Sequence, residues 1–160
     1  MPYTMKVDGM EEVSALLDRM QERAPAAAAS GLYEGAGVMA DEVRRGAESI
    51  RTAPFHYVRA GTRLPSPEEK AIVTQASAGI AKFSKTGSEV DTSVGFRNAG
   101  YAQLKGKTVP IPKIVNAINS GTSFMQKQPF VRKAARAAAP KAMNAIKKRI
   151  EAEFEAMGKE

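Results

Sequence analysis

The sequence predicts an α+β fold in one domain that spans residues 1–160. Apolar residues recur at the helical period in the N-terminal third of the chain and again in its C-terminal part. Between these parts, residues 79–96 alternate apolar and polar side chains around a glycine turn, which is typical of a β-hairpin. We therefore expect N-terminal helices, a small antiparallel β-sheet with a hairpin, and a long C-terminal helix.

The N-terminal part begins with a predicted strand over residues 3–7, which a helix follows. Asp8 is a suitable cap for this helix, and Glu11 and Glu12 lie in its first turn, where the helix dipole favours acidic side chains. Pro25 should interrupt this helix or begin a second one. The apolar stripes of these helices consist of Met10, Val13, Leu17 and Met20, and of Leu32, Ala36, Met39, Val43 and Ile50.

Two short helices and the hairpin occupy the middle of the chain. Ser66 as N-cap and Glu69 at the third helical position predict a capping box, which begins a helix that runs to about Ser77. A further helix is predicted over residues 111–121, where Gly121 ends it. We expect hairpin strands at 80–84 and 89–96, a turn at 85–88, and loops at 51–66 and 97–110. On the second strand, Val90, Thr92, Val94 and Phe96 should share one face.

One long helix should run from Pro129 to about Met157. Pro140 should kink or break it, because proline removes a backbone hydrogen bond and clashes with the preceding turn. Its predicted apolar face consists of Val131, Ala135, Ala138, Ala142, Ile146, Ile150 and Met157.

The composition narrows the class of protein. The chain has no cysteine, which excludes disulfides, thiol catalysis and cysteine-bound zinc. No signal peptide and no apolar run of membrane-spanning length is found in the sequence, so we expect a soluble protein made in a cytoplasm, without membrane contact. Because aromatic residues make up only 6% of the chain and alanine buries little area, we expect oligomerisation to add stability.

Residue patterns of enzymes are weak in this chain. His56 is the only histidine, and a single histidine in a predicted loop is more often a surface or packing residue than a general base. The Gly-x-Gly of residues 35–37 lies within a predicted helix and follows no strand, so it does not fit a dinucleotide site. Residues 120–124 lack the frame of a phosphate-binding loop. We expect neither enzymatic activity, nor a metal, nor a cofactor.

Charge is distributed unevenly along the sequence. The net charge is +7, with −4 over residues 1–50 and +11 over residues 51–160. Residues 127–149 contain eight basic and no acidic side chains. The helix dipole favours acidic side chains at the start of a helix and basic ones at its end, so a basic start is the reverse of what the dipole alone would favour. Four of these side chains fall within about 100° of arc on the predicted helix, namely Arg132, Lys133, Arg136 and Lys147. This face could meet DNA or an acidic neighbour, or it could be a solvated face that complements the acidic N-terminal part.

A short polar loop precedes the C-terminal helix and contains unusually many apolar side chains. Its sequence from Asn119 onward is NSGTSFMQKQPFVRKA, with Phe124, Met125 and Phe130 among polar residues. Either these side chains fold back on the core or they contact another molecule. Gly121 supplies backbone freedom, and Pro129 suits the start of a helix.

This segment resembles a motif of tailed-phage minor structural proteins, the head–tail joining or tail-completion proteins of long-tailed phages. The shared pattern is Gly-Thr-Ser, a methionine shortly after it, and Pro-Phe at the start of the last helix. The resemblance implies a non-enzymatic virion protein of the neck or tail, assembled in the host cytoplasm as a ring around the DNA channel. It implies contacts with head-closure, tail-terminator or tail-tube proteins, and possible sequence-independent contact with genomic DNA. The interface residues that it implies are Gly121, Thr122, Phe124, Met125, Pro129 and Phe130.

A second hypothesis remains open beside the structural one. The basic helix could instead belong to a small nucleic-acid-binding or regulatory protein. No base-reading motif is present, so its contacts would be with phosphates. A ring that forms without DNA would favour the first hypothesis, and salt-sensitive duplex binding by a monomer would favour the second.

Overall fold

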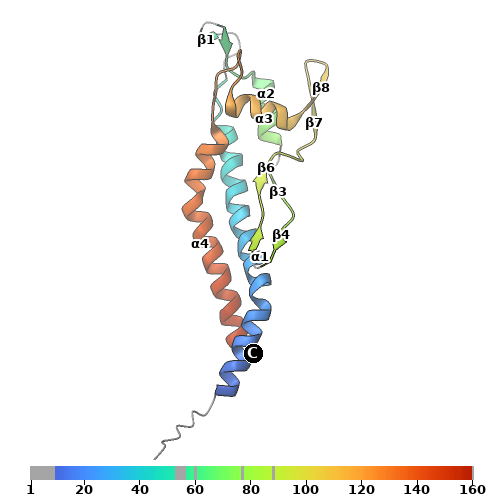
Figure 1. The fold of residues 1–160 in the computed structure, drawn as a ribbon. Coiled ribbons are helices and arrows are strands. Elements are labelled where there is room, and N and C mark those ends of the chain that lie inside the picture. Colours follow the sequence, from blue (N-terminus) through green and yellow to red (C-terminus); the bar gives the residue numbers. More distant parts are fainter. Residues whose placement is uncertain (1–9, 53–56, 60, 77, 88, 160) are drawn as a thin grey trace, which may run out of the picture.

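A long antiparallel pair of helices forms the frame of the molecule in the computed structural model, which describes residues 10–52, 57–59, 61–76, 78–87 and 89–159. Helix α1 spans Met10–Glu48 and helix α4 spans Phe130–Gly158, and the two lie side by side along most of their length (Figure 1). The remaining elements lie beside α1 and at the end of the pair where α4 begins. The α+β class predicted from the sequence is confirmed. The strand predicted at residues 3–7 lies outside the described residues.

Small residues bring α1 and α4 into close contact. Buried positions recur every fourth residue in both helices, which is the spacing of one helical ridge. A Cβ atom added to Gly31 would lie 2.8 Å from Cγ1 of Ile150, and one added to Gly35 would lie 2.5 Å from Cγ1 of Ile146. The isoleucines therefore occupy the space that these glycines leave. The seam positions are Ala27, Gly31, Gly35, Val43 and Ala47 on α1, and Phe130, Ala134, Ala138 and Ala142 on α4.

Both prolines expected to interrupt helices lie inside continuous ones. Pro25 is within α1, so the two predicted N-terminal helices are a single helix of 39 residues. Pro140 is within α4, which continues for 29 residues, so the predicted break is wrong, whereas the predicted kink stays a prediction. Each proline removes one backbone hydrogen bond from a helix that keeps many others and packs along a long seam. Packing therefore outweighs the local preference of about 3 kcal/mol against proline.

Two short helices cap the end of the pair where α4 begins. Helix α2 spans Pro67–Gln75, and its N-cap Ser66 forms the predicted capping box with Glu69. Helix α3 spans Ile111–Ser120 and ends at Gly121, whose φ of +76° is readily adopted only by glycine. Both predicted helices are confirmed to within about two residues.

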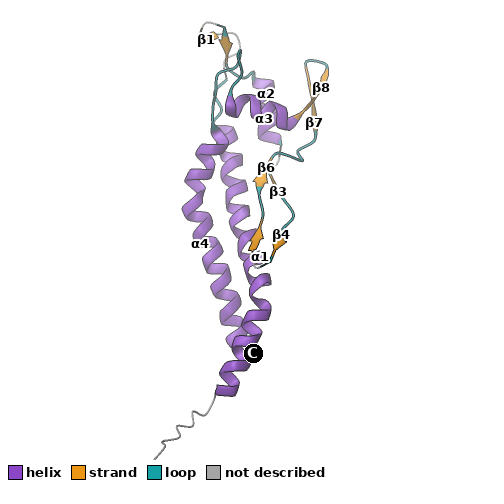
Figure 2. Cartoon of the chain, in the orientation of Figure 1, coloured by secondary structure: helices purple, strands orange, loops and turns teal. Residues whose placement is uncertain are grey.

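The strands are short and form pairs rather than one sheet (Figure 2). The predicted hairpin is present: β4 (Ser84–Thr86) pairs with β5 (Glu89–Asp91), and β3 (Gly79–Ile80) pairs with β6 (Val94–Gly95). Its alternation is also confirmed, because Val90, Thr92 and Val94 are half-buried and Phe96 is buried, whereas Asp91 and Ser93 are exposed. This hairpin lies along α1.

Two segments expected to be loops contain strands. Residues 97–110 include a hairpin of β7 (Tyr101–Leu104) and β8 (Lys107–Pro110), whose turn residues Lys105 and Gly106 have φ of +50° and +76°. These are the angles of a type I′ turn, which lysine followed by glycine signals less strongly than asparagine followed by glycine. Within residues 51–66, β1 (Tyr57–Arg59) pairs with β2 (Thr62–Arg63).

The hydrophobic core lies where the last turns of α1 meet the start of α4, α2 and α3. Val73 and Ile118 are fully buried there. The rings of Phe96 and Phe130 meet edge to face, with 6.4 Å between their centroids. The core is thus concentrated at one end of the molecule, directly behind the loop that precedes α4. No helix in the described residues is long and apolar enough to span a membrane.

Candidate interaction surface

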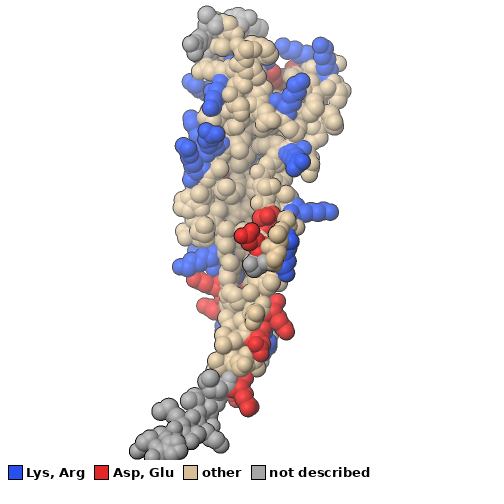
Figure 3. All heavy atoms as spheres, viewed as in Figure 1, with Lys and Arg blue, Asp and Glu red and all other residues tan. Residues whose placement is uncertain are grey.

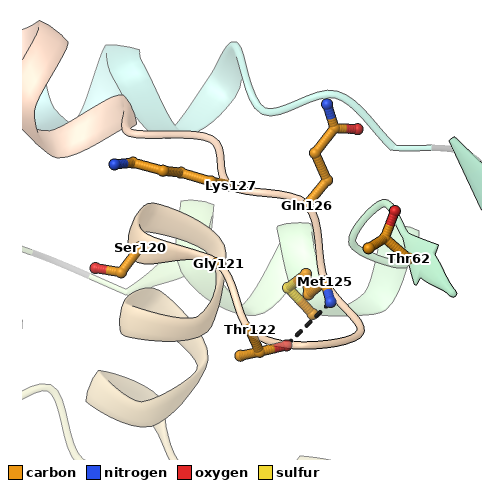
Figure 4. Close-up of a pocket in the computed structure, with 7 residues that line it drawn as sticks. All are labelled: Thr62, Ser120, Gly121, Thr122, Met125, Gln126 and Lys127. Atoms are coloured by element: carbon orange, nitrogen blue, oxygen red, sulfur yellow. Dashed lines mark hydrogen bonds between the residues drawn. The ribbon is translucent and has the colours of Figure 1, made fainter. Parts of the chain in front are cut away.

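The loop between α3 and α4 is held by its own polar residues. The N–H of Met125 donates to Oγ1 of Thr122 at 2.9 Å, and the N–H of Thr122 donates to the carbonyl of Met125 at 3.0 Å. These reciprocal bonds close a tight turn directly after Gly121, and Figure 4 draws the bond from the N–H of Met125 to Thr122. At the other end, the N–H of Val131 donates to Oδ1 of Asn119, which caps the start of α4. The motif residues therefore fix the shape of the loop.

Arg63 holds the loop from the opposite side. Its N–H donates to the carbonyl of Phe124 at 2.8 Å, and its own carbonyl accepts from the N–H of Gln126 at 2.9 Å. Residues 124–126 therefore pair with β2 like a short parallel strand, with Met125 opposite Arg63. Alternate residues of an extended segment point to opposite sides, so this pairing separates Phe124 from Met125.

The three apolar side chains of the loop divide into buried and exposed. Met125 and Phe130 are each only 4% exposed and belong to the core. Phe124 is 62% exposed. Thr122 is exposed, whereas Gly121 and Pro129 are half-buried. Of the residues that the resemblance assigns to an interface, Phe124 and Thr122 are thus the ones presented to solvent, while Met125 and Phe130 anchor the loop.

A buried carboxylate positions Arg63. The two guanidinium nitrogens Nη1 and Nη2 of Arg63 each donate to one carboxylate oxygen of Glu69 at 2.7 Å, and the N–H of Ser66 donates to the same carboxylate at 2.8 Å. Burial raises the pKa of Glu69, but the hydrogen bonds from Arg63 and Ser66 outweigh it, so the pKa lies below its ordinary value of 4.5. Glu69 therefore links the capping box of α2 to the strand that supports the loop. The sequence pattern indicated the cap but not this second role.

The loop borders an open polar hollow (Figure 4). Of its lining residues, only Lys127 carries a charge at neutral pH. Oε1 of Gln126 is buried without a hydrogen-bond partner among the described residues. No group of three or more histidine, cysteine, aspartate or glutamate side chains in the described part of the chain is placed to hold a metal ion. The lining residues are Thr62, Ser120, Gly121, Thr122, Met125, Gln126 and Lys127.

The predicted basic face of α4 is exposed. Arg132, Lys133 and Arg136 make no ion pair with any described residue, and Lys147 lies 3.9 Å from Glu151 of the next turn. Among the described residues, two cations of this helix bond to α1: Nε of Arg149 donates to Oγ of Ser30 at 2.8 Å, and Lys141 donates to Glu42 at 3.2 Å. The hydrogen bond from Lys141 is the largest of the contributions that lower the pKa of Glu42. None of the four predicted basic residues is therefore paired with a described residue of the acidic N-terminal part.

Charge is separated along the length of the molecule. Residues 92–150 contain twelve basic and no acidic side chains, whereas residues 10–24 and 150–158 together contain seven acidic and two basic ones. Because α1 and α4 are antiparallel, the two acidic segments meet at the end away from the loop. Figure 3 shows lysine and arginine over the end with the loop and most acidic side chains toward the other end.

Comparison of the chain with protein-family models, curated proteins and solved structures finds no match.

Proposed function

We propose that this chain is a non-enzymatic structural protein of a tailed-phage virion, which helps to join or complete the tail at the head–tail neck as a ring around the DNA channel. The observation that carries the proposal is the loop that follows Gly121. Each residue of the motif has a distinct part in the loop: Thr122 closes the turn, Met125 anchors it, and Phe130 begins α4 inside the core. Together these contacts leave Phe124 exposed to solvent, and an exposed aromatic side chain suits a protein interface.

The proposed partners are further copies of the chain and the head-closure, tail-terminator or tail-tube proteins of the virion. Arg132, Lys133, Arg136 and Lys147 would face the DNA channel or an acidic neighbour. Contacts with phosphates through these residues would not depend on DNA sequence. Assembly would take place in the host cytoplasm.

A deletion experiment tests this function. In a phage whose genome encodes the chain, deletion of its gene should leave filled heads and tails that remain separate in electron micrographs. The wild-type gene on a plasmid should restore joined particles, and Phe124→Ser should not. Tyr101→Ser is the matched control, because Tyr101 is also aromatic and 72% exposed but lies on β7. Normal particles from the deletion strain would refute the proposal.

A second function is favoured by the segment 92–150, which lacks acidic side chains. The chain could be a small sequence-independent nucleic-acid-binding or regulatory protein. Its duplex affinity should then fall steeply with rising salt, and Arg132→Glu with Arg136→Glu should abolish binding without altering virion morphology. Separate heads and tails in the deletion strain would contradict this alternative.

A further inference from the structure

Helix α1 extends beyond the end of α4. Gly31 lies against Ile150 and Gly35 against Ile146, which fixes the antiparallel register of the two helices. Since Gly158 ends α4 eight positions after Ile150, α4 reaches only about as far as Arg23. Residues 10–22 therefore project past α4 by about 20 Å at 1.5 Å per residue. Figure 1 shows this free end of α1 beyond the mark of the C-terminus.

The apolar seam of α1 continues onto this projecting end. Val13, Leu17 and Met20 lie within about 60° of the face that Gly31 and Gly35 turn toward α4, taking 100° per residue. Val13 is 52% and Leu17 58% exposed, although they occupy the same stripe as buried residues further along. The face that packs against α4 is thus uncovered over the first turns of α1. An isolated helical segment of this length is only marginally stable in water.

A complementary face is present on the outside of α4. Met143 is 65% exposed and lies between Arg136 and Lys147 in one stripe, to which Arg132 also belongs. From Arg132 to Lys147 this stripe is about 22 Å long, which matches the projecting end of α1. The two faces also carry opposite charge, because residues 10–22 contain four acidic side chains and one basic side chain.

We infer that the projecting end of α1 of one copy, through Val13, Leu17 and Met20, docks on the outer face of α4 of a second copy, around Met143. The contact joins two different surfaces, so it is repeated from copy to copy and closes into a ring when the rotation between copies permits. This inference rests on the proposed function, because the proposed ring is the assembly that the contact would build. Charge argues against the alternative in which two projecting ends pair with each other, since both are acidic and would repel.

Complementation between two variants tests this contact in the purified chain. Val13→Ser with Leu17→Ser disrupts the projecting face, and Arg132→Glu with Arg136→Glu disrupts the face on α4. All four side chains are exposed, so circular dichroism should be unchanged. Sedimentation velocity over a concentration series should show self-association of the wild-type chain and of the control Tyr101→Ser. Each double variant alone should associate at least tenfold more weakly.

A mixture of the two double variants decides the question. It should form a 1:1 complex and nothing larger, because one variant keeps a working α4 face and the other a working α1 end. Self-association of the Arg132→Glu, Arg136→Glu variant would overturn the inference and indicate pairing between α1 ends. A monomeric mixture, or a monomeric wild-type chain, would also overturn it. These outcomes do not depend on the phage deletion, so failure of the contact and failure of the proposed function can be told apart.

Discussion

Gln128 and Arg51 are joined across 77 positions of sequence by two hydrogen bonds. The N–H of Arg51 donates to Oε1 of Gln128, and Nε2 of Gln128 donates to the carbonyl of Arg51, both at 2.9 Å. The side-chain amide thereby satisfies both backbone groups of Arg51, which lies three residues after the end of α1 at Glu48. It fixes the end of α1 beside the start of α4, where the core is concentrated.

Gln128→Ala should therefore destabilise the chain. Two hydrogen bonds of about 0.5–1.5 kcal/mol each are lost, so we expect a decrease of about 1–3 kcal/mol in the free energy of unfolding. Urea denaturation followed by circular dichroism would measure it. Gln103→Ala is the control, since it removes an exposed amide that bonds only Thr108 within its own hairpin. An equal decrease in the free energy of unfolding in both variants would show that the two bonds to Arg51 contribute no more than the bond to Thr108.

The glycines of α1 should respond differently to alanine according to their place on the helix. At Gly35, the added Cβ would lie 2.5 Å from Ile146 and 3.3 Å from the carbonyl of Ala142. Overpacking of about 1–3 kcal/mol outweighs the gain in helix propensity of about 1 kcal/mol, so Gly35→Ala should destabilise the chain. At Gly37 nothing lies within 4 Å, so Gly37→Ala should stabilise it by about 0.5–1 kcal/mol. Thermal unfolding of both variants checks the opposite signs; a stabilised Gly35→Ala variant would contradict the close seam.

Glu69 should make stability depend on pH in the acid range. Its pKa in the folded chain lies below the ordinary 4.5, so its carboxylate stabilises the fold fully above that value. The contribution is lost as the pH falls through the folded pKa. Glu69→Gln should cost about 1.5–3 kcal/mol near neutral pH, because a charged hydrogen-bond acceptor is removed, and the difference from wild type should shrink below pH 4.5. Denaturant unfolding at several pH values measures this difference. Glu68→Gln, at an exposed neighbouring position, is the control; a pH-independent cost of Glu69→Gln would exclude the proposed role of the carboxylate.

The neighbouring loop residues Met125 and Phe124 should differ in how much they contribute to the stability of the chain. Met125→Ala opens a cavity in the core and should cost about 2–5 kcal/mol. Phe124→Ala removes a side chain that is 62% exposed, so it should change stability by no more than about 0.5 kcal/mol. Differential scanning calorimetry of the two variants tests the division between anchor and exposed residue. Similar losses in both would mean that Phe124 also supports the fold.

Local signals in the sequence predicted the elements whose geometry is decided locally. The capping box of Ser66 and Glu69, the glycine that ends α3 and the alternation of residues 90–96 all involve residues within a few positions of one another. Such contacts are encoded in short patterns, and the structure reproduces them. The apolar loop was also recognised, although the sequence did not distinguish the buried Met125 from the exposed Phe124.

What the sequence did not predict depends on distant partners. Pro25 and Pro140 remain helical because each helix is supported along a seam by the other, which no local rule contains. The bridges from Gln128 to Arg51 and from Arg63 to the loop likewise join parts of the chain that are far apart in sequence. A usable signal for the seam was present in the spacing of Gly31 and Gly35 and of the alanines of α4, which recur every fourth residue.

The distance in sequence between the two halves of the seam has a consequence for synthesis on the ribosome. Gly31 meets Ile150, which is translated 119 residues later. At about 5–20 residues per second, α1 would wait roughly 6–24 s before the matching part of α4 is made. During that interval the small middle elements can form from local contacts, while the apolar stripe of α1 stays uncovered. The nascent chain is therefore most exposed to aggregation and to chaperone binding through α1, before the helix that covers it exists.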